Sequence, residues 1–305
     1  MEGVACVETK EELLELAKEN NVNFLFEASV GGGIPVIRPM SRCLSANNIE
    51  RIAGILNGTT NYILHQMFTN NKSFETALSD AQAMGYAERN PAADIEGHDA
   101  CRKIAILSSL ACGKEVDYRK ISTEGITDIT LDDVKCAEAA DSVIKLIGYA
   151  EFMDDGKVYA HVAPMLINNK CMLAPINDVF NGVLVTGNAV GDVMFYGAGA
   201  GKLPTASAVV ADIVDSAIHN ERRKLIGWTK PETDTSADAD AKKFRYFIRT
   251  SDDKETVKAV FSNVTEIECL AQTDFAFITE PLSVSELNEE KSKLGGIKTA
   301  IRVLD

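Results

Sequence analysis

Residues 157–190 read KVYAHVAPMLINNKCMLAPINDVFNGVLVTGNAV. β-branched and aromatic residues alternate with smaller or polar ones here, and asparagines interrupt the pattern. The alternation is typical of β-strands and the asparagines of turns. The stretch therefore predicts strands at residues 158–167, 171–176 and 182–187, and with them a β-sheet.

Helical patterns dominate the chain before this stretch. Apolar residues at helical spacing predict helices at residues 9–20, from about residue 60 to 68, at 73–84 and at 97–111. The last two are followed by Gly85 and Gly113, which suit helix ends. Residues 23–28 predict a short buried strand. Together the patterns indicate an α+β fold with a mixed sheet.

Two glycine-rich segments flank these elements. Gly31 to Gly33 are consecutive and predict a tight loop, because glycine permits positive φ and close approach of backbones. Residues 197–201 read GAGAG and precede an amphipathic helix, so this segment is a candidate anion site at a helix N-terminus. It lacks the G-x-G-x-x-G pattern of a dinucleotide fold, and a structural turn is an equally good explanation.

The chain after residue 229 has a different character. Residues 230–240 are polar and acidic and predict a linker. Residues 241–305 then predict a strand, a helix, two strands, a helix and a strand. This βαββαβ order is that of the ferredoxin-like fold. The prediction is therefore two domains, residues 1–229 and 241–305.

Composition limits the possible functions. The 305 residues carry a formal net charge of −14, which argues against a nucleic-acid binder because such proteins need a basic face. The seven cysteines include no C-x-x-C, as expected for reduced thiols. No apolar run is long enough to span a membrane, and the N-terminus does not resemble a signal peptide. We expect a soluble, cytoplasmic protein that binds neither nucleic acid nor membrane.

Ionisable residues are densest between residues 85 and 103. Asp99 and Lys103 are four residues apart in a predicted helix, so they share a face. Asp94 is placed to cap that helix. By spacing alone, an exposed ion pair and an ordinary cap are the commoner explanation. The apolar run after Lys103 nevertheless favours its partial burial, and a partly desolvated lysine beside a carboxylate is a candidate proton-transfer group.

Two other segments are weaker candidates. Glu27 precedes the triple-glycine loop, and one carboxylate with several carbonyl oxygens could hold a hard cation. Residues 57–61, NGTTN, predict a turn and a helix N-cap. The four histidines have no mutual metal-ligand spacing and are assigned no metal role.

Four segments in this order resemble homoserine dehydrogenases. They are FEASVGGGIPVI (26–37), ILNGTTNYIL (55–64), GYAERNPAADIEGHDACRK (85–103) and MFYGAGAGKLPTASAVVADI (194–213). The resemblance implies NAD- or NADP-dependent interconversion of L-homoserine and L-aspartate 4-semialdehyde. It also implies that residues 1–229 form the substrate-binding and dimerisation domain, with residues 1–21 as the connection to a nucleotide-binding domain.

The same resemblance implies roles for individual residues. The catalytic pair would be Lys103, as acid/base, and Asp99. The substrate-binding residues would be Glu88, Asp94, Asp99, Gly58 and Thr59. The cofactor-binding residues would be Gly199 and Gly201. A sodium ion would be held by Glu27 and by backbone carbonyls at Val30, Gly32 and Ile34.

The rest of the chain sets further expectations. Residues 241–305 resemble an ACT regulatory domain, which implies threonine binding, although the usual Asp-x-x-Gly turn here lacks its glycine at residues 251–256. No G-x-G-x-x-G domain precedes residue 24, so we expect a fragment, a split enzyme with a separate nucleotide-binding polypeptide, or an inactive form. A homo-oligomer, a dimer or a dimer of dimers, is expected. The alternative function is a non-catalytic, amino-acid-sensing dimeric binding protein.

Overall fold

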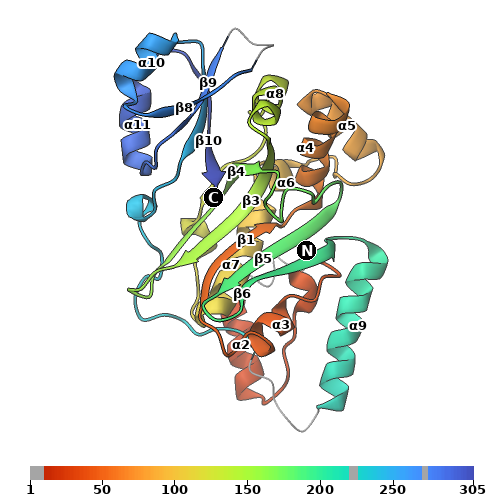
Figure 1. The fold of residues 1–305 in the computed structure, drawn as a ribbon. Helices are drawn as coiled ribbons and strands as arrows, with labels where there is room; N and C mark the ends of the chain where they lie inside the picture. The colour runs from red at the N-terminus through yellow and green to blue at the C-terminus, as the bar shows by residue number, and fades with distance from the viewer. Residues whose placement is uncertain (1–9, 220–225, 270–273) are drawn as a thin grey trace.

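The computed structural model describes residues 10–219, 226–269 and 274–305. The strands of these residues form one mixed sheet in the order β6-β5-β1-β3-β4-β10-β7-β9-β8, with β2 paired to β4 (Figure 1). The strands are β1 Ile49–Ile55, β2 Ser122–Thr123, β3 Ser142–Phe152, β4 Val158–Asn168, β5 Phe180–Gly187, β6 Gly191–Ala198, β7 Tyr246–Thr250, β8 Val264–Ile267, β9 Phe275–Thr279 and β10 Ile297–Leu304. The α+β prediction is confirmed.

The strand predictions in residues 157–190 are confirmed for two segments of three. Residues 158–167 lie in β4 and residues 182–187 in β5. Residues 171–176 instead form turns, so that prediction is wrong. Leu173, Ala174 and Ile176 are buried, whereas Met172 is exposed. The carbonyl oxygen of Ile176 accepts hydrogen bonds from Lys145 and Asn61. The apolar content of residues 171–176 was not enough to distinguish a loop that packs on the sheet from a strand within it.

The helices of the first 140 residues lie mainly on one face of the sheet. They are α2 Lys10–Glu19, α3 Ile37–Arg42, α4 Gly58–Asn70, α5 Phe74–Ala83, α6 Ala92–Ile95, α7 His98–Cys112 and α8 Leu131–Ala139. α7 packs on β1, β3 and β4, and buries Ile104 and Leu107 in a core shared with Ile52 of β1 and with Leu56, which follows that strand. The four helix predictions before residue 112 are confirmed within the described residues.

Residues 23–28 do not form the predicted strand. Residues 23–26 are irregular, and Glu27–Ser29 form a 3₁₀ turn, η1. Phe24 and Phe26 contact each other with ring centroids 5.8 Å apart, and Phe26 meets Trp228 edge-on. These aromatic residues therefore pack against other rings, and the described residues offer no neighbouring strand to pair with this segment.

The last 60 residues confirm the predicted βαββαβ order. β7 is followed by α10 (Lys254–Val260), β8, β9, α11 (Val284–Ser292) and β10, and the strands lie in the order β10-β7-β9-β8. β10 also pairs in parallel with β4, with Arg302 opposite Met165. One sheet thus runs through both predicted domains, and α10 and α11 cover its outer end (Figure 1).

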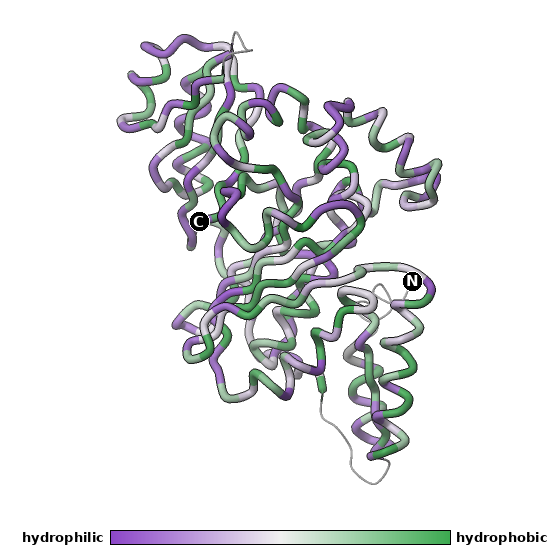
Figure 2. The backbone as a smooth tube through the Cα atoms, turned by 45° about the vertical axis from the view of Figure 1, so that its right-hand side comes forward, coloured by the Kyte–Doolittle hydropathy of each residue, from purple (hydrophilic) through white to green (hydrophobic). Residues whose placement is uncertain are grey.

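Hydropathy follows this layering. The strands in the middle of the molecule are largely hydrophobic, as is much of helix α9 (Lys202–Ile218), which is among the helices at the lower right of Figure 2. Across the described residues, no helix is both long and apolar enough to cross a bilayer.

A buried arginine joins the C-terminal unit to α8. Arg249 of β7 donates from Nε to Asp133 Oδ1 at 2.8 Å and from Nη2 to Thr130 Oγ1 at 3.1 Å, and it also pairs with Asp274. Asp133 is fully buried and forms the capping box of α8 with Thr130. Removing the arginine would leave a buried carboxylate without its cation.

Arg249→Met is therefore expected to destabilise the protein by about 3–5 kcal/mol in urea unfolding, because a buried ion pair would lose one partner. The matched control is Lys243→Met, since Lys243 pairs with Glu286 on the surface, where both side chains are about half exposed. That control is expected to change stability by less than about 1 kcal/mol. Equal losses for the two variants would contradict the role of Arg249.

Candidate functional site

A polar cluster lies just beyond the carboxyl end of β1, and Asn57 is its centre. Asn57 Oδ1 accepts the backbone N–H of Thr60 at 2.9 Å and so caps α4. Its Nδ2 donates to Asp94 Oδ1 at 2.7 Å and to Asp99 Oδ2 at 2.9 Å. The amide carries two hydrogens, so both bonds form together. One side chain thus joins α4, α6 and α7.

Lys103 completes the cluster from the next turn of α7. Its Nζ donates to Asp99 Oδ2 at 2.7 Å and to the carbonyl oxygen of Leu56 at 3.0 Å. The Lys103 side chain is 17 % exposed and that of Asp99 31 %. The pair is therefore partly buried and tied to the backbone, and the explanation as an exposed surface pair is wrong. Two of the three ammonium hydrogens have acceptors among the described residues, which leaves one donor for a ligand.

The two carboxyl groups of the cluster have opposite pKa shifts. Burial raises the pKa of Asp94 above its usual value, and the Asn57 bond only partly offsets this. Burial also acts to raise the pKa of Asp99, but Lys103, Asn57 and Arg102 together hold it below its usual value. Asp99 is thus the carboxylate that stays charged, while Asp94 takes up a proton more readily.

The other predicted substrate residues surround the cluster. Thr59 is buried, and its hydroxyl donates to the carbonyl oxygen of Tyr86 at 2.7 Å. This bond holds the segment that carries Glu88, which is exposed. Gly58 lies so close to Val179 that a Cβ would come within 2.8 Å of its carbonyl oxygen. The described residues give no acceptor for the N–H groups of Gly58 and Thr59, so both remain for a ligand.

Asp94 does not cap α7, and that expectation is wrong. α7 starts after Gly97, which has φ +85° and no side-chain cap. Asp94 instead lies in the one-turn helix α6, and the chain must turn at Gly97 to bring Asp94 and Asp99 to the same amide. The left-handed conformation at Gly97 explains why sequence spacing misplaced the carboxylate.

The predicted cofactor residues lie at the same end of the sheet. Gly199 and Gly201 follow β6 and precede α9. Ile55 pairs with Gly182, and Phe180 pairs with Ala198, so the end of β1, the start of β5 and the end of β6 are side by side. Both candidate sites therefore face one edge of the sheet. The triple-glycine loop also reaches this edge, with Gly33 N–H donating to the Ala198 carbonyl at 3.1 Å.

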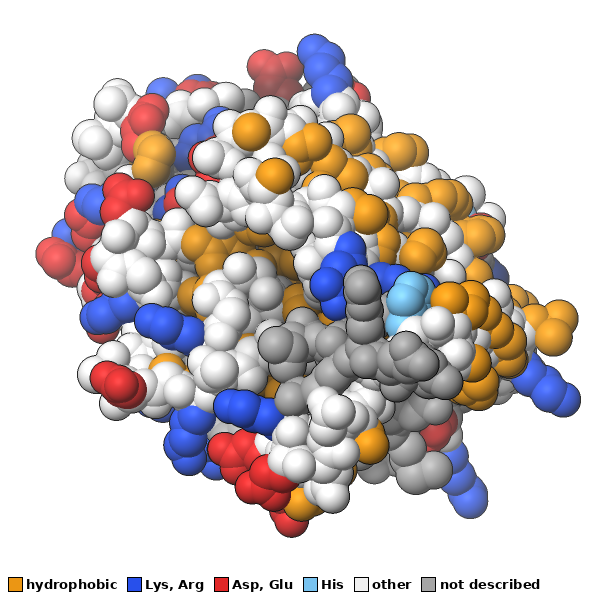
Figure 3. All heavy atoms as spheres, turned by 90° about the horizontal axis from the view of Figure 1, so that it is seen from below, with side chains coloured by type: hydrophobic (Ala, Val, Ile, Leu, Met, Phe, Trp, Pro, Cys, Tyr) orange, Lys and Arg blue, Asp and Glu red, His pale blue; other side chains and the backbone are white. Residues whose placement is uncertain are grey.

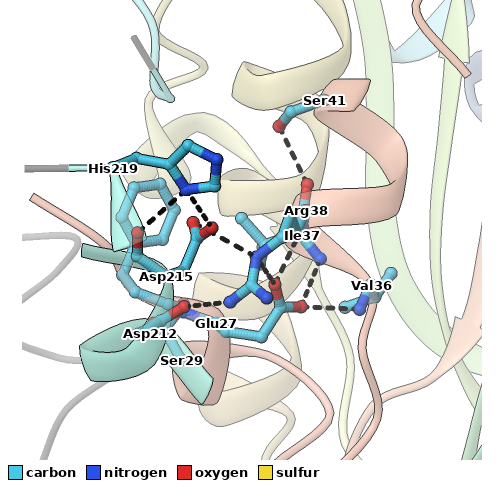
Figure 4. A network of polar contacts seen from close by, with 10 residues as sticks. Glu27, Ser29, Val36, Ile37, Arg38, Ser41, Asp212, Asp215 and His219 are labelled. Carbon is cyan, nitrogen blue, oxygen red and sulfur yellow. Dashed lines mark hydrogen bonds and ion pairs between the residues drawn. The ribbon is translucent and has the colours of Figure 1, made fainter. Parts of the chain in front are cut away.

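Glu27 serves as a helix cap (Figure 4). Its Oε1 accepts the backbone N–H groups of Val36 and Ile37 at 2.7 and 2.8 Å, and its Oε2 accepts that of Arg38 at 2.9 Å. Burial raises its pKa despite these donors and the nearby guanidinium. A cation needs free lone pairs. The donors around Glu27 do not suit the predicted sodium ion, so its site, with Val30, Gly32 and Ile34, stays a prediction without support.

The same network anchors α9. Arg38 donates to Asp212 Oδ1 at 2.5 Å, and Asp212 Oδ2 accepts the backbone N–H of Glu27 at 2.9 Å. Asp215, one turn on, lies 3.3 Å from Nδ1 of His219 (Figure 4). These contacts fix the direction in which the helix leaves the glycine loop. The rest of α9 stands away from the sheet (Figure 1).

Sequence reasoning missed a second buried network beside the site. Lys145 of β3 is 2 % exposed, and its Nζ donates to the Ile176 carbonyl at 2.6 Å, Asn61 Oδ1 at 3.0 Å and Asn177 Oδ1 at 3.1 Å. Burial lowers its pKa to about 8. Asn61 in turn donates to the Ile176, Asp178 and Phe180 carbonyls, which holds the loop against α4. The feature of the sequence that could have revealed this network is a lysine within an apolar strand.

Lys103→Met is expected to lower stability by about 1–3 kcal/mol at neutral pH, because Asp99 would lose its cation. Folding lowers the pKa of Asp99. Its ion pair with Lys103 therefore stabilises the native protein fully above the pKa that Asp99 has in the unfolded chain, and this stabilisation is lost as pH falls through its lower pKa in the folded protein. The gap in unfolding free energy between the native protein and Lys103→Met should therefore shrink below about pH 4. Urea unfolding at several pH values measures it, and a gap that stays constant down to pH 2 would contradict the assignment.

The chain is similar to known proteins of one family. A family model described as "Homoserine dehydrogenase" matches residues 35–214. A homoserine dehydrogenase of Helicobacter pylori is 42 % identical over 283 residues, which are 93 % of this chain and 65 % of the relative. The crystal structure of a homoserine dehydrogenase from Thiobacillus denitrificans has a TM-score of 0.87 and 33 % identity over 98 % of this chain and 74 % of that one. A hyperthermophilic archaeal homoserine dehydrogenase, in complex with NADPH, has a TM-score of 0.60 and 29 % identity over 70 % of this chain and 61 % of that one.

The coverage of the relatives is partial. The chain spans 65 % of the length of the Helicobacter relative and about half of the length of other curated relatives that it matches. The family match covers more than half of the chain and includes the Asn57 turn, the Asp94–Lys103 block and the Gly199–Gly201 loop. The chain therefore belongs to the homoserine dehydrogenase family.

Proposed function

We propose that this chain supplies the amino-acid site for the NAD(P)-dependent interconversion of L-homoserine and L-aspartate 4-semialdehyde. The observation that carries the proposal is the cluster of Asn57, Asp94, Asp99 and Lys103, with one lysine donor left for a ligand. An oriented ammonium group beside open backbone N–H groups suits a small amino acid with a carbonyl or hydroxyl in its side chain.

Each group has a definite part in the proposal. In the reducing direction the remaining Lys103 N–H donates to the aldehyde oxygen and then gives up the proton, while Asp99 keeps the ammonium group oriented. The carboxylates of Asp94 and Glu88 bind the substrate's ammonium group. The N–H groups of Gly58 and Thr59 at the start of α4 bind its carboxylate, since a helix N-terminus favours an anion.

The nicotinamide cofactor supplies the hydride. The glycine loop suits such a cofactor, because it leads into a 17-residue helix that has no side-chain cap, and Gly201 takes a left-handed φ of +118° directly before the first helical residue. We propose that these glycines approach its nicotinamide end. We propose no sodium ion at Glu27, because its carboxylate already accepts three backbone N–H groups.

We further propose that the cofactor-binding part docks on α9, whether it belongs to a longer form of this chain or to a separate polypeptide. Large apolar side chains are exposed along the helix: Leu203, Val209, Val210, Ile213, Val214 and Ile218. Figure 3 shows hydrophobic side chains gathered toward the right of the face seen from below, which is the side on which α9 lies in Figure 1. A groove of about 590 Å³ lies between Val209 and Ile213 on one side and Phe24 to Phe26 on the other. Exposed apolar patches of this kind mark interfaces.

Oligomer formation and threonine binding are proposed on the resemblance to the family. The βαββαβ unit would be the place for threonine. The loop after β7, at residues 251–256, has no glycine of its own. Asp252 in this loop accepts the N–H of Gly296, the residue before β10, at 2.9 Å, so a glycine from elsewhere in the unit contacts the loop.

Mixing the chain with the nucleotide-binding part of a relative is expected to produce homoserine-dependent reduction of NADP. In that mixture Lys103→Met should lower turnover about 10²–10⁴-fold, as loss of a general acid does. Absorbance at the reduced nicotinamide band measures the rate. The matched control is Lys120→Met, because Lys120 pairs with Asp234 on the surface. Comparable turnover in both variants would refute the role of Lys103.

Ile213→Glu on α9 is expected to prevent that reconstitution and to leave the melting temperature of the isolated chain unchanged, because Ile213 is 62 % exposed. A charge in an apolar interface would be desolvated without a partner. Met84→Glu, just after α5, is the matched control, since Met84 is 50 % exposed elsewhere on the surface. Co-sedimentation and rate measurements test both. Normal reconstitution with Ile213→Glu would exclude α9 as the docking face.

A further inference from the structure

Asn181 is a buried amide whose polar atoms are unused. The residue lies in β5 and is 1 % exposed, yet neither Oδ1 nor Nδ2 has a hydrogen-bond partner among the described residues. Other buried amides nearby are well used: Asn57 and Asn61 each bind several groups. A buried amide without a hydrogen-bond partner destabilises the folded protein, so the stability of the fold does not explain why an asparagine is present at this position.

The strand register places Asn181 between the two candidate sites. Along β5, Asn181 points to the same face as Val183 and Val185, which share a core with α7. Gly182 pairs with Ile55, so Leu56 comes beside Asn181 at the end of β1. The Leu56 carbonyl is an acceptor for Lys103. On the other side, Asn181 pairs with Gly197, two residues before Gly199.

The glycine loop lies directly on this amide. A Cβ at Gly199 would come within 2.1–2.4 Å of Asn181 Cγ, Nδ2 and Oδ1. The side-chain amide therefore packs directly against Gly199, in the loop that leads into the uncapped N-terminus of α9. Two independent features thus meet at one place: a helix start with permissive glycines, and a buried donor–acceptor pair without partners.

We propose that Asn181 is a hydrogen-bonding residue of the ligand site between the Lys103 cluster and the Gly199–Gly201 loop, and that it binds a neutral group that both donates and accepts. A primary amide matches such a group because it offers one of each and carries no charge. The inference deepens the proposed function and rests on it. Two sources have this chemistry: the carboxamide of a nicotinamide ring, and the hydroxyl of the amino alcohol.

Asn181→Leu separates a ligand-binding role from a structural one. Leucine has nearly the same shape and removes the unpaired amide, so the melting temperature should rise by about 2–4 °C. Ligand affinity should fall about tenfold or more, because one hydrogen-bonding partner is lost. The matched control is Asn61→Leu. Asn61 binds three carbonyl oxygens and Lys145, so that variant should lower the melting temperature.

The binding test uses the side-chain amide resonance of Asn181 in ¹H–¹⁵N spectra of the full chain, assigned by its absence in Asn181→Asp. Nicotinamide mononucleotide and L-homoserine are titrated separately. We expect this resonance to shift with one of them, which identifies the source of the ligand group. The dissociation constant of that probe should then rise about tenfold in Asn181→Leu.

Three outcomes would decide against the inference, and they differ from each other. A lower melting temperature for Asn181→Leu with unchanged dissociation constants would make Asn181 a structural residue. Probe-induced shifts near Lys103 without a shift at Asn181 would overturn the inference and leave the proposed function standing. No shift anywhere with either probe, together with no turnover after reconstitution, would remove the proposed function as well.

Discussion

The amide of Asn57 is the interaction on which the candidate site depends. Its oxygen starts α4, and its two hydrogens hold Asp94 of α6 and Asp99 of α7. The three helices thereby meet in a defined orientation. Asp99 can then hold Lys103 over the end of β1, where the Leu56 carbonyl accepts its second bond. A charged pair kept partly from water in this way is stiff, and that is a condition for orienting a small substrate.

The sheet gives the cluster its neighbours. β1 and β6 end, and β5 begins, at one edge, so three loops far apart in the sequence lie together there. The polar pair of Arg38 and Asp212 sets the direction of α9 as it leaves this edge. Glu27 satisfies the start of α3 and is thereby removed as a ready cation ligand. The positions of both candidate sites therefore follow from where β1 and β6 end and β5 begins.

The C-terminal unit is part of the same construction. Its last strand, β10, pairs with β4, and Arg249 holds the buried carboxylate that caps α8. A shared sheet and a buried ion pair give the two units a stiffer connection than a linker of eleven residues would. A ligand that moved α10 or α11 would act on strands that lead back toward β3 and β1. The predicted division at residues 230–240 therefore separates two sequence patterns within one continuous sheet.

Local pattern in the sequence determined the helices around Tyr62, Ala77 and Ile104, the strands at Val162 and Val183, and the βαββαβ order of the last residues. Each depends on periodicity and on caps such as Ser73 and Gly113, which act over a few residues. Sequence also singled out Asp99 and Lys103, because helical spacing relates them. Only the tertiary structure decided that Asn57 joins both carboxylates, that Glu27 caps a helix, and that Asn181 lies unpaired beneath Gly199. These contacts cross up to 42 residues of chain, and burial and strand register, which set them, are properties of the folded chain and not of any short stretch.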